Sequence, residues 1–181
     1  MDCEYPFGPL VQATDGNFYG TTEAGGANGC TRGGGCGTIF EVTSAGQLTT
    51  LHTFSGTDGG DSSTPLLQAT NGVFYGTTDE GGILTACRAL GCGTVFALDV
   101  GLDPFVKTLP SIGKVGSRVR ILENNLTGTT SVAFDGAPAT FSVVSDTQIT
   151  TSVPTSATTG VVEVTTPSGV LKSNVEFHVV Q

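Results

Sequence analysis

The sequence contains no tryptophan, one methionine and few charged side chains, which make up 13% of its 181 residues. Seven residues are basic and 16 are acidic, so the formal net charge is −9. Proteins bind nucleic acids and anionic membrane surfaces through clustered cations, and the basic residues of this chain do not cluster. The charge pattern therefore excludes nucleic acid and anionic lipid surfaces as predicted partners.

Long apolar runs and helical periodicity are also missing. No segment approaches the roughly 18–20 apolar residues that a membrane-spanning helix needs. The segment Met1–Tyr5 has neither a basic region nor an apolar one, so no signal peptide is visible there. Because no apolar pattern with a period of 3.6 residues stands out, we expect almost no helix and no membrane insertion.

Candidate catalytic residues are scarce, since the chain has two histidines, His52 and His178. Nucleophilic catalysis requires a serine or cysteine beside a histidine and an orienting acid. Neither histidine is near a Gly-x-Ser-x-Gly motif. We interpret both as exposed strand residues and predict a non-enzymatic protein that needs no cofactor.

Carboxylates in the turns offer a weaker alternative, a calcium site formed by Asp58, Asp61 and Asp79–Glu80. Calcium prefers oxygen ligands of this type. Their spacing matches neither the EF-hand loop nor the Gly-Gly-x-Gly-x-Asp nonapeptide. We therefore favour solvated loop residues at these positions.

A repeat dominates the first half of the sequence. Pro9–Thr22 returns as Pro65–Thr78, and Cys36–Phe40 returns as Cys92–Phe96, both with an offset of 56 residues. The chain also has 27 glycines, as expected for short strands joined by tight turns. A period of this length indicates one supersecondary unit that packs its apolar face against the next copy.

Each copy is predicted to form four strands. In the second copy these are Leu66–Thr70, Val73–Thr78 and Gly93–Leu98, with a fourth from the segment that matches Gln47–Phe54. The first two strands should be joined by a hairpin at Asn71–Gly72, or Asp15–Gly16 in the first copy, because both residue types tolerate positive φ.

Four antiparallel strands correspond to one blade of a β-propeller, and a ring takes about four to eight blades. Residues 1–102 supply fewer than two complete blades. We therefore predict that 1–102 is an incomplete tandem β-repeat region, truncated at the N-terminus, whose partners are missing repeats of the same protein.

The five cysteines point to an oxidising compartment. Cys30 with Cys36, and Cys87 with Cys92, lie in equivalent loops of the two copies, whereas Cys3 is left over. We predict one local disulfide in each loop, and structural disulfides indicate export from the cytosol. Free thiols and a four-cysteine zinc site remain alternatives, although the spacings are looser than the C-x2-C usual for zinc.

Tyrosine occupies the same position in both copies, as Tyr19 and Tyr75, each after a phenylalanine. Such rings can stack on a sugar. In an alternating strand, however, one ring of each pair must point into the interface between blades. We favour core packing over a sugar platform, and the absence of tryptophan weakens the lectin interpretation.

From Phe105 onward the chain alternates with a period of two. The inward residues expected from this pattern are Val119 and Ile121, Val132 and Phe134, Phe141 and Val143, and Val175, Phe177 and Val179. About seven short strands separated by turn signals are typical of an antiparallel sandwich. The predicted fold is therefore all-β, with propeller-like blades over 1–102 and an immunoglobulin-like β-sandwich over 103–181.

Two family resemblances cover nearly the whole chain. The stretches Asp15–Thr22 and Cys36–Phe40, with their second copies, resemble the GloVer-type tandem repeat of bacterial choice-of-anchor surface proteins. This resemblance implies a secreted or surface-anchored repeat protein with no established chemistry.

The second half resembles an IPT/TIG domain, which has an immunoglobulin-like fold. The matching segments include Pro110–Gly116, Val119–Ile121, Val132–Gly136, Val153–Pro154 and Val164–Gly169. One residue departs from the family pattern: Glu123 stands where the pattern usually has glycine, before Asn124–Leu126. If that turn requires positive φ, Glu123 is strained; otherwise the turn is built differently in this chain.

The sequence thus predicts a non-enzymatic extracellular or cell-surface module with a structural or binding role, in adhesion or in binding an unknown protein or glycan. The alternative is an accessory, non-catalytic region of a larger secreted carbohydrate-active enzyme. It rests on the domains beside which IPT/TIG domains occur, since a fold alone does not decide function.

Overall fold

A computed structural model describes residues 4–26, 30, 34–83, 85, 87 and 90–180. These residues form β-strands and no α-helix, which confirms the predicted all-β fold. Within the same ranges, no helix has the length and apolar character needed to cross a bilayer. The leftover Cys3 lies outside the described residues.

The chain divides into two compact units. Unit 1 comprises Met1–Ala69 and Val73–Leu102, and unit 2 comprises Thr70–Gly72 and Asp103–Gln181. Unit 1 contains both copies of the repeat except Thr70–Gly72, and unit 2 contains the segment with alternating apolar residues.

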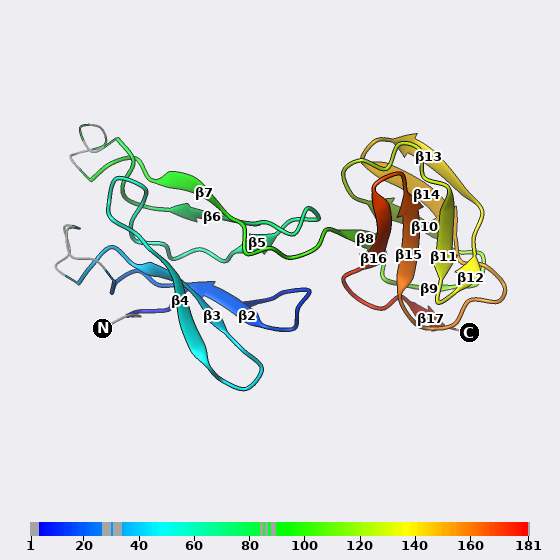
Figure 1. The fold of residues 1–181 in the computed structure, drawn as a ribbon, viewed down its shortest axis with the longest axis horizontal. Coiled ribbons are helices and arrows are strands. Elements are labelled where there is room, and N and C mark those ends of the chain that lie inside the picture. Colours follow the sequence, from blue (N-terminus) through cyan, green and yellow to red (C-terminus); the bar gives the residue numbers. More distant parts are fainter. Residues whose placement is uncertain are drawn as a thin grey trace. The chain divides into compact units, whose positions relative to one another are not determined.

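The first repeat folds into an antiparallel meander. Its described strands are β1 (Val11–Gln12), β2 (Phe18–Thr21), β3 (Thr38–Val42) and β4 (Leu48–Thr53), in the order β1-β2-β3-β4. Each strand thus pairs with the next one along the chain, as in a propeller blade (Figure 1).

The second repeat repeats this meander through its first three strands. They are β5 (Leu67–Gln68), β6 (Phe74–Thr78) and β7 (Thr94–Leu98), in the order β5-β6-β7. The prediction of a fourth strand in this sheet is wrong. The segment 56 residues after β4 forms β8 (Phe105–Leu109), which instead pairs with two strands of unit 2. Consequently, β7 is the edge of its sheet in the described part of the chain.

The hairpin of each repeat has a three-residue loop. In the first repeat the Ala13 N–H donates to the Asn17 carbonyl at 2.9 Å, which encloses residues 14–16. Gly16 and Gly72 take positive φ, 84° and 86°, whereas the residues before them do not. The predicted hairpins are therefore confirmed at both sites, and within each dipeptide only the glycine takes positive φ.

A pair of threonines fastens the start of each glycine-rich loop. In the first repeat the Thr22 hydroxyl accepts the Thr38 N–H at 2.9 Å and lies 3.0 Å from the Thr38 hydroxyl. Thr78 and Thr94 repeat both contacts at 2.9 Å. These pairs satisfy buried polar groups in the same way in both copies, which explains why Gly-Thr-Thr and Cys-Gly-Thr recur together.

The core of unit 1 lies between the two sheets. It brings Tyr19, Ile39 and Phe54 of the first repeat together with Leu66, Phe74 and Phe96 of the second. The Tyr19 and Phe74 ring centroids are 4.4 Å apart, and those of Phe54 and Phe96 are 5.2 Å apart. Tyr19 is thus a core residue, as predicted, whereas 37% of Tyr75 is exposed.

Unit 2 forms one sheet that curls on itself. Its strands after β8 are β9 (Ile112–Lys114), β10 (Arg118–Leu122), β11 (Ser131–Phe134), β12 (Ala137–Pro138), β13 (Phe141–Ser145), β14 (Gln148–Ser152), β15 (Val162–Thr166), β16 (Gly169–Ser173) and β17 (His178–Val180). The halves β12-β11-β15-β16 and β8-β10-β14-β13 are antiparallel and meet where β16 pairs with β8 in parallel. Parallel pairing of β17 with β9 adds a short ribbon.

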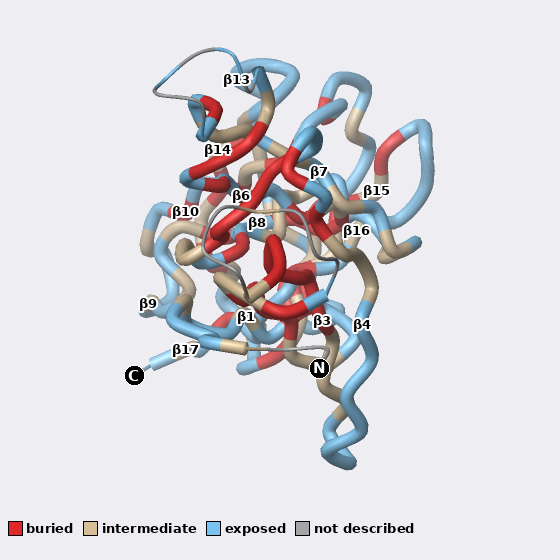
Figure 2. The backbone as a smooth tube through the Cα atoms, turned by 90° about the vertical axis from the view of Figure 1, so that its left-hand side faces the viewer, coloured by how far each residue is buried: buried red, intermediate tan, exposed pale blue. Residues whose placement is uncertain are grey.

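The two halves of this sheet share one core, so unit 2 is a curled, sandwich-like β-sheet (Figure 1). One half supplies Val132, Phe134, Val162 and Val164, and the other supplies Val106, Val119, Ile121 and Ile149. The predicted alternation is therefore correct for β10 and β11, where inward residues are buried and Arg118 and Arg120 are exposed. Figure 2 shows the buried segments in red.

Two residues expected inside the sandwich are exposed. Val143 is 38% exposed because it lies on β13, which is the last strand of the sheet. Val175 is 49% exposed because it precedes β17, which begins at His178. The turn after β10 also differs from the family pattern, since Asn125 has positive φ (65°) and the buried Glu123 does not.

Candidate functional site

A pocket of about 260 Å³ opens in unit 1, at the loop ends of the two repeats. Four segments meet there: the N-terminal segment, the loop after β2, the connector between the repeats and the end of β6. The lining residues are Tyr5, Phe7, Glu23, Ala24, Gly34, Gly35, Asp61 and Glu80.

The backbone of this pocket follows the repeat. Tyr5 and Asp61 are 56 residues apart, and both have positive φ, 58° and 57°. The Tyr5 carbonyl accepts the Glu23 N–H at 3.2 Å, and the Asp61 carbonyl accepts the Asp79 N–H at 3.1 Å. Positive φ is uncommon for a residue with a large side chain. Strained residues cluster at ligand sites, so two of them lining one pocket favour a binding role.

Two aromatic rings stand at the pocket. Tyr5 and Phe7 are 61% and 66% exposed, and their ring centroids lie 6.2 Å apart with planes only 13° from parallel. Exposed aromatic side chains leave apolar surface in contact with water, and a ligand that covers this surface gains free energy of binding. The stacked pair therefore leaves apolar ring surface exposed beside the polar part of the pocket.

The polar part of the pocket is acidic. Glu23 is half-buried, whereas Asp61 and Glu80 are 7% and 9% exposed. The described lining residues include no lysine, arginine or histidine. Carboxylates accept hydrogen bonds and donate none when ionised, so the described lining favours ligands that carry hydroxyl groups.

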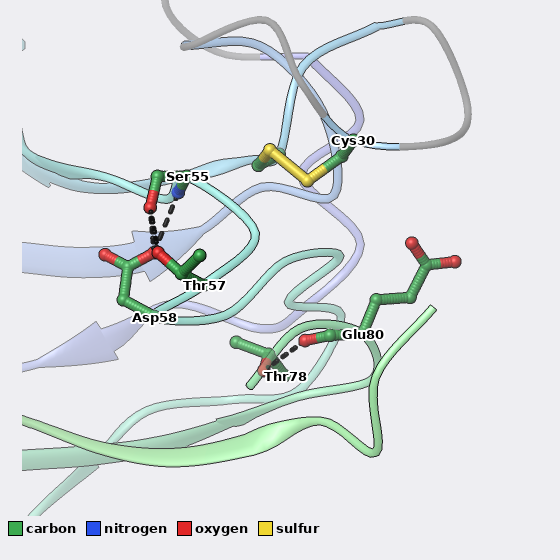
Figure 3. The surroundings of a disulfide bond; sticks show 7 residues. Cys30, Ser55, Thr57, Asp58, Thr78 and Glu80 are labelled. Carbon is green, nitrogen blue, oxygen red and sulfur yellow. Dashed lines mark hydrogen bonds between the residues drawn. A yellow bond between two sulfur atoms is a disulfide. The ribbon is translucent and has the colours of Figure 1, made fainter. Parts of the chain in front are cut away.

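The first disulfide supports one wall of the pocket. The structure joins Cys30 to Cys36, and the Cys36 carbonyl accepts the Asp61 N–H at 3.1 Å. The Glu80 carbonyl accepts a hydrogen bond from the Thr78 hydroxyl at 2.9 Å (Figure 3). The backbone of both buried acidic residues is thus fixed by the repeat scaffold.

The second disulfide joins Cys87 to Cys92 in the equivalent loop. Both pairings fit the expectation from the sequence. The two bonds differ in burial: Cys36 is fully buried, whereas Cys87 and Cys92 are exposed. Only the first disulfide is therefore part of a packed core.

The two histidines lie outside the pocket lining. His52, on β4, contacts Asp58 through Nε2 at 2.9 Å, and the Ser55 hydroxyl donates to the other oxygen of Asp58 at 2.8 Å. The carboxylate thus stands between histidine and serine, so His52 cannot take the serine proton as a triad requires. His178 is exposed at the start of β17.

The acidic residues considered as calcium ligands do not gather at one point. Over the described ranges, no three His, Cys, Asp or Glu side chains are arranged to hold a metal ion. Partial burial opposes ionisation of Asp58, but hydrogen bonds from Ser55 and His52 outweigh it and lower the pKa of this carboxyl. Asp58 closes a turn, as Figure 3 shows, whereas Asp61 lines the pocket. The prediction of solvated side chains is wrong for Asp61 and Glu80, which are 7% and 9% exposed.

Sequence reasoning did not identify the aromatic part of the pocket. Tyr5 and Phe7 precede the first matching segment, so the repeat gave them no prominence. The available signal was the 56-residue offset itself, which aligns Tyr5 with Asp61, a residue already considered as a ligand. Extending the alignment four residues further upstream would have placed Tyr5 at the loop end of the first repeat.

Comparisons with known proteins address the family rather than the ligand. A crystal structure of an auxiliary nutrient binding protein from Bacteroides ovatus is similar, with 23% identity and a TM-score of 0.37. The match covers 42% of this chain and 20% of that protein. No curated protein sequence matches the chain.

The repeat itself is matched by a family description. The sequence pattern of the Gloeobacter/Verrucomicrobia repeat matches residues 1–131, well over half of the chain, and thus extends beyond the two repeats into unit 2. The expected resemblance of the first half is therefore confirmed, whereas the IPT/TIG assignment of the second half stays a prediction. The chain belongs to the Gloeobacter/Verrucomicrobia repeat family.

Proposed function

We propose that this chain is a non-catalytic extracellular module that binds an uncharged carbohydrate in the acidic pocket of unit 1. The observation that carries the proposal is the pair of exposed, nearly parallel rings of Tyr5 and Phe7 at a pocket with acidic walls. Ligand sites typically combine apolar and aromatic surface with a few fixed polar groups.

The chemistry of each part supports a sugar. The ring pair can stack on the apolar face of a pyranose. Glu23, Asp61 and Glu80 can accept hydrogen bonds from its hydroxyl groups. An acidic sugar would be disfavoured, because the whole chain has a net charge of −9.

An extracellular location accords with the two disulfides, since these bonds persist in oxidising compartments. The role of an accessory region in a secreted carbohydrate-active enzyme makes the same binding prediction, because such a region also holds a glycan. The two roles differ in the domains that accompany this chain. Adhesion requires in addition that the bound glycan belong to another cell or to a matrix.

Isothermal titration with cellohexaose, chitohexaose and maltohexaose tests the proposal, with polygalacturonate as the anionic probe. We expect at least one neutral probe to bind and polygalacturonate not to bind. Tyr5→Ala and Phe7→Ala should each weaken binding about tenfold or more, equivalent to at least about 1.4 kcal/mol. Tyr5→Phe should keep most of the affinity, because it keeps the ring.

The control is Tyr75→Ala. Tyr75 is a partly exposed tyrosine that the sequence offered as a sugar platform, and it does not line the pocket. It should leave the affinity unchanged. Tighter binding of polygalacturonate than of the neutral probes, or a loss of binding in Tyr75→Ala alone, would contradict the proposed site.

A further inference from the structure

The second repeat exposes an apolar sheet face. Leu67, Tyr75 and Ala97 stand in register across β5, β6 and β7, and Val95 lies in the next row, opposite Thr77. Leu67 is 62% exposed and Val95 is 78% exposed. We call these four residues, Leu67, Tyr75, Val95 and Ala97, the outer face.

The same face of the first repeat is covered. The positions 56 residues earlier are Val11, Tyr19, Ile39 and Glu41, which keep the same register. Tyr19 and Ile39 are each only 2% exposed, because they pack against the second repeat. The chain therefore shows within itself what this face binds.

The covering surface is the opposite face of a repeat. In the second repeat it consists of Leu66, Phe74 and Phe96, which contact the first repeat in the core of unit 1. Its counterpart in the first repeat, Leu10, Phe18 and Phe40, we call the receiving face. Leu10 is 53% exposed, whereas the equivalent Leu66 is 5% exposed. Phe18 is half-buried and Phe40 is only 7% exposed, so Leu10 is the open part of the receiving face.

We propose that a second copy of this chain docks its receiving face onto the outer face, so that copies join head to tail through the contact that already joins the two repeats. Such a contact uses different surfaces on the two partners and leaves one of each free, so it extends to rings or filaments. The occupant follows from continuity with the contact inside unit 1, where Tyr19 lies against Phe74.

The contact is independent of the proposed sugar site, since none of its residues lines the pocket. Each copy carries a net charge of −9, so mutual repulsion opposes assembly. Salt screens this repulsion within about 10 Å at 0.1 M. Assembly should therefore strengthen as the salt concentration rises, as expected for an apolar contact.

Sedimentation velocity over a range from about 5 to about 500 µM, suited to the weak affinity of small interfaces, tests the proposal. All proteins carry Cys3→Ser, so that the leftover cysteine cannot link copies. The parent should show a mass that rises with concentration. Val95→Glu places a charge on the outer face, and Leu10→Lys places one on the receiving face. Each change should block docking at that face, so each variant alone should stay monomeric.

Mixing the two variants gives the decisive result. Val95→Glu keeps its receiving face and Leu10→Lys keeps its outer face, so an equimolar mixture should form dimers that do not grow further. Val144→Glu, a matched change of an exposed valine on β13 (60% exposed), should assemble like the parent. Circular dichroism checks that every variant retains its strands.

Four outcomes would overturn the proposal. They are a parent that stays monomeric throughout, a Leu10→Lys variant that still assembles alone, a mixture that stays monomeric, and assembly that both variants retain. The second outcome would mean that two outer faces bind each other, and the last would point to another surface, such as the edge of β7. Titration with the neutral sugars is read separately, so failure of either proposal leaves the other standing.

Discussion

The two repeats share two closely similar segments, Pro9–Thr22 with Pro65–Thr78 and Cys36–Phe40 with Cys92–Phe96, but place matching residues in different surroundings. Ile39 is 2% exposed and its counterpart Val95 is 78% exposed; for Tyr19 and Tyr75 the values are 2% and 37%. The first three strands of each repeat pair in the same register, so the difference comes from the neighbours of each sheet. In a stacked repeat, burial depends on position in the stack as well as on the residue.

The fourth strand shows the same dependence. β4 completes the first sheet, whereas the equivalent segment, β8, joins the sheet of unit 2. In β8, Val106 and Thr108 are buried in its new sheet, and Val106 belongs to the sandwich core. The position of a segment in a repeat does not decide its partners when another sheet offers a better core.

Truncating Phe74, or its counterpart Phe18 in the first repeat, should give the largest difference in stability loss between the repeats. Phe74 is fully buried against Tyr19, whereas Phe18 is half-buried. Phe74→Ala should destabilise unit 1 by about 3–5 kcal/mol, and Phe18→Ala by clearly less. Urea unfolding followed by tyrosine fluorescence measures this, since all three tyrosines lie in unit 1. Equal losses would contradict the assigned stacking.

Removing one disulfide or the other should give the second-largest difference in stability loss between the repeats. Each closes a loop of similar length, so loop entropy alone gives about 2 kcal/mol for either. The double variant Cys30→Ser, Cys36→Ser also disturbs the core that contains Cys36, and should lose more than Cys87→Ser, Cys92→Ser. The same urea titration decides the order. A larger loss from the exposed disulfide would refute it.

Alanine at the matching positions Gly76 and Gly20 should give a smaller difference in stability loss between the repeats. A Cβ at Gly76 would press on the Phe96 ring and lie 3.0 Å from Leu66 Cδ2, inside the packed core. A Cβ at Gly20 meets Leu10 and the Phe40 ring, both at 2.7 Å. Phe40 is buried, but Leu10 is exposed and can move away. Gly76→Ala should lose about 1–3 kcal/mol through overpacking, and Gly20→Ala less. Similar losses at both sites would show that the Leu10 side is packed as well.

The smallest expected effect is a pH dependence of the stability of unit 2, which arises from Glu123 and should be absent from the repeats. Burial raises the pKa of Glu123, and the charge of Asp146 adds to this, although the Asn124 N–H opposes it. The folded state thus holds the proton more tightly than the unfolded state. The resulting stability is present below the ordinary glutamate pKa and is lost as pH rises through the raised value.

Glu123→Gln removes this dependence. The variant should match the parent below about pH 4 and become the more stable protein towards about pH 7. Thermal unfolding of the full chain, followed by far-ultraviolet circular dichroism, measures the difference. Glu176→Gln, at an exposed position, serves as the control. A Glu123→Gln variant that is less stable than the parent at neutral pH would contradict the assigned shift.

Much of this fold could be predicted from the sequence, because glycine, threonine and cysteine recur at matched positions and each has a local role. Period-two alternation likewise predicts the inward residues of β10 and β11. The pairing of β8 and the exposure of Val95 could not be predicted, since both depend on distant segments. The pocket was missed because Tyr5 precedes the repeat pattern.

The most direct test of the stacked repeats is a two-dimensional NOE spectrum of the aromatic rings at low protein concentration. We predict cross-peaks between Tyr19 and Phe74, whose ring centroids lie 4.4 Å apart, and between Phe54 and Phe96, at 5.2 Å. A folded protein in which Tyr19 shows no cross-peak to any residue of the second repeat would contradict the account.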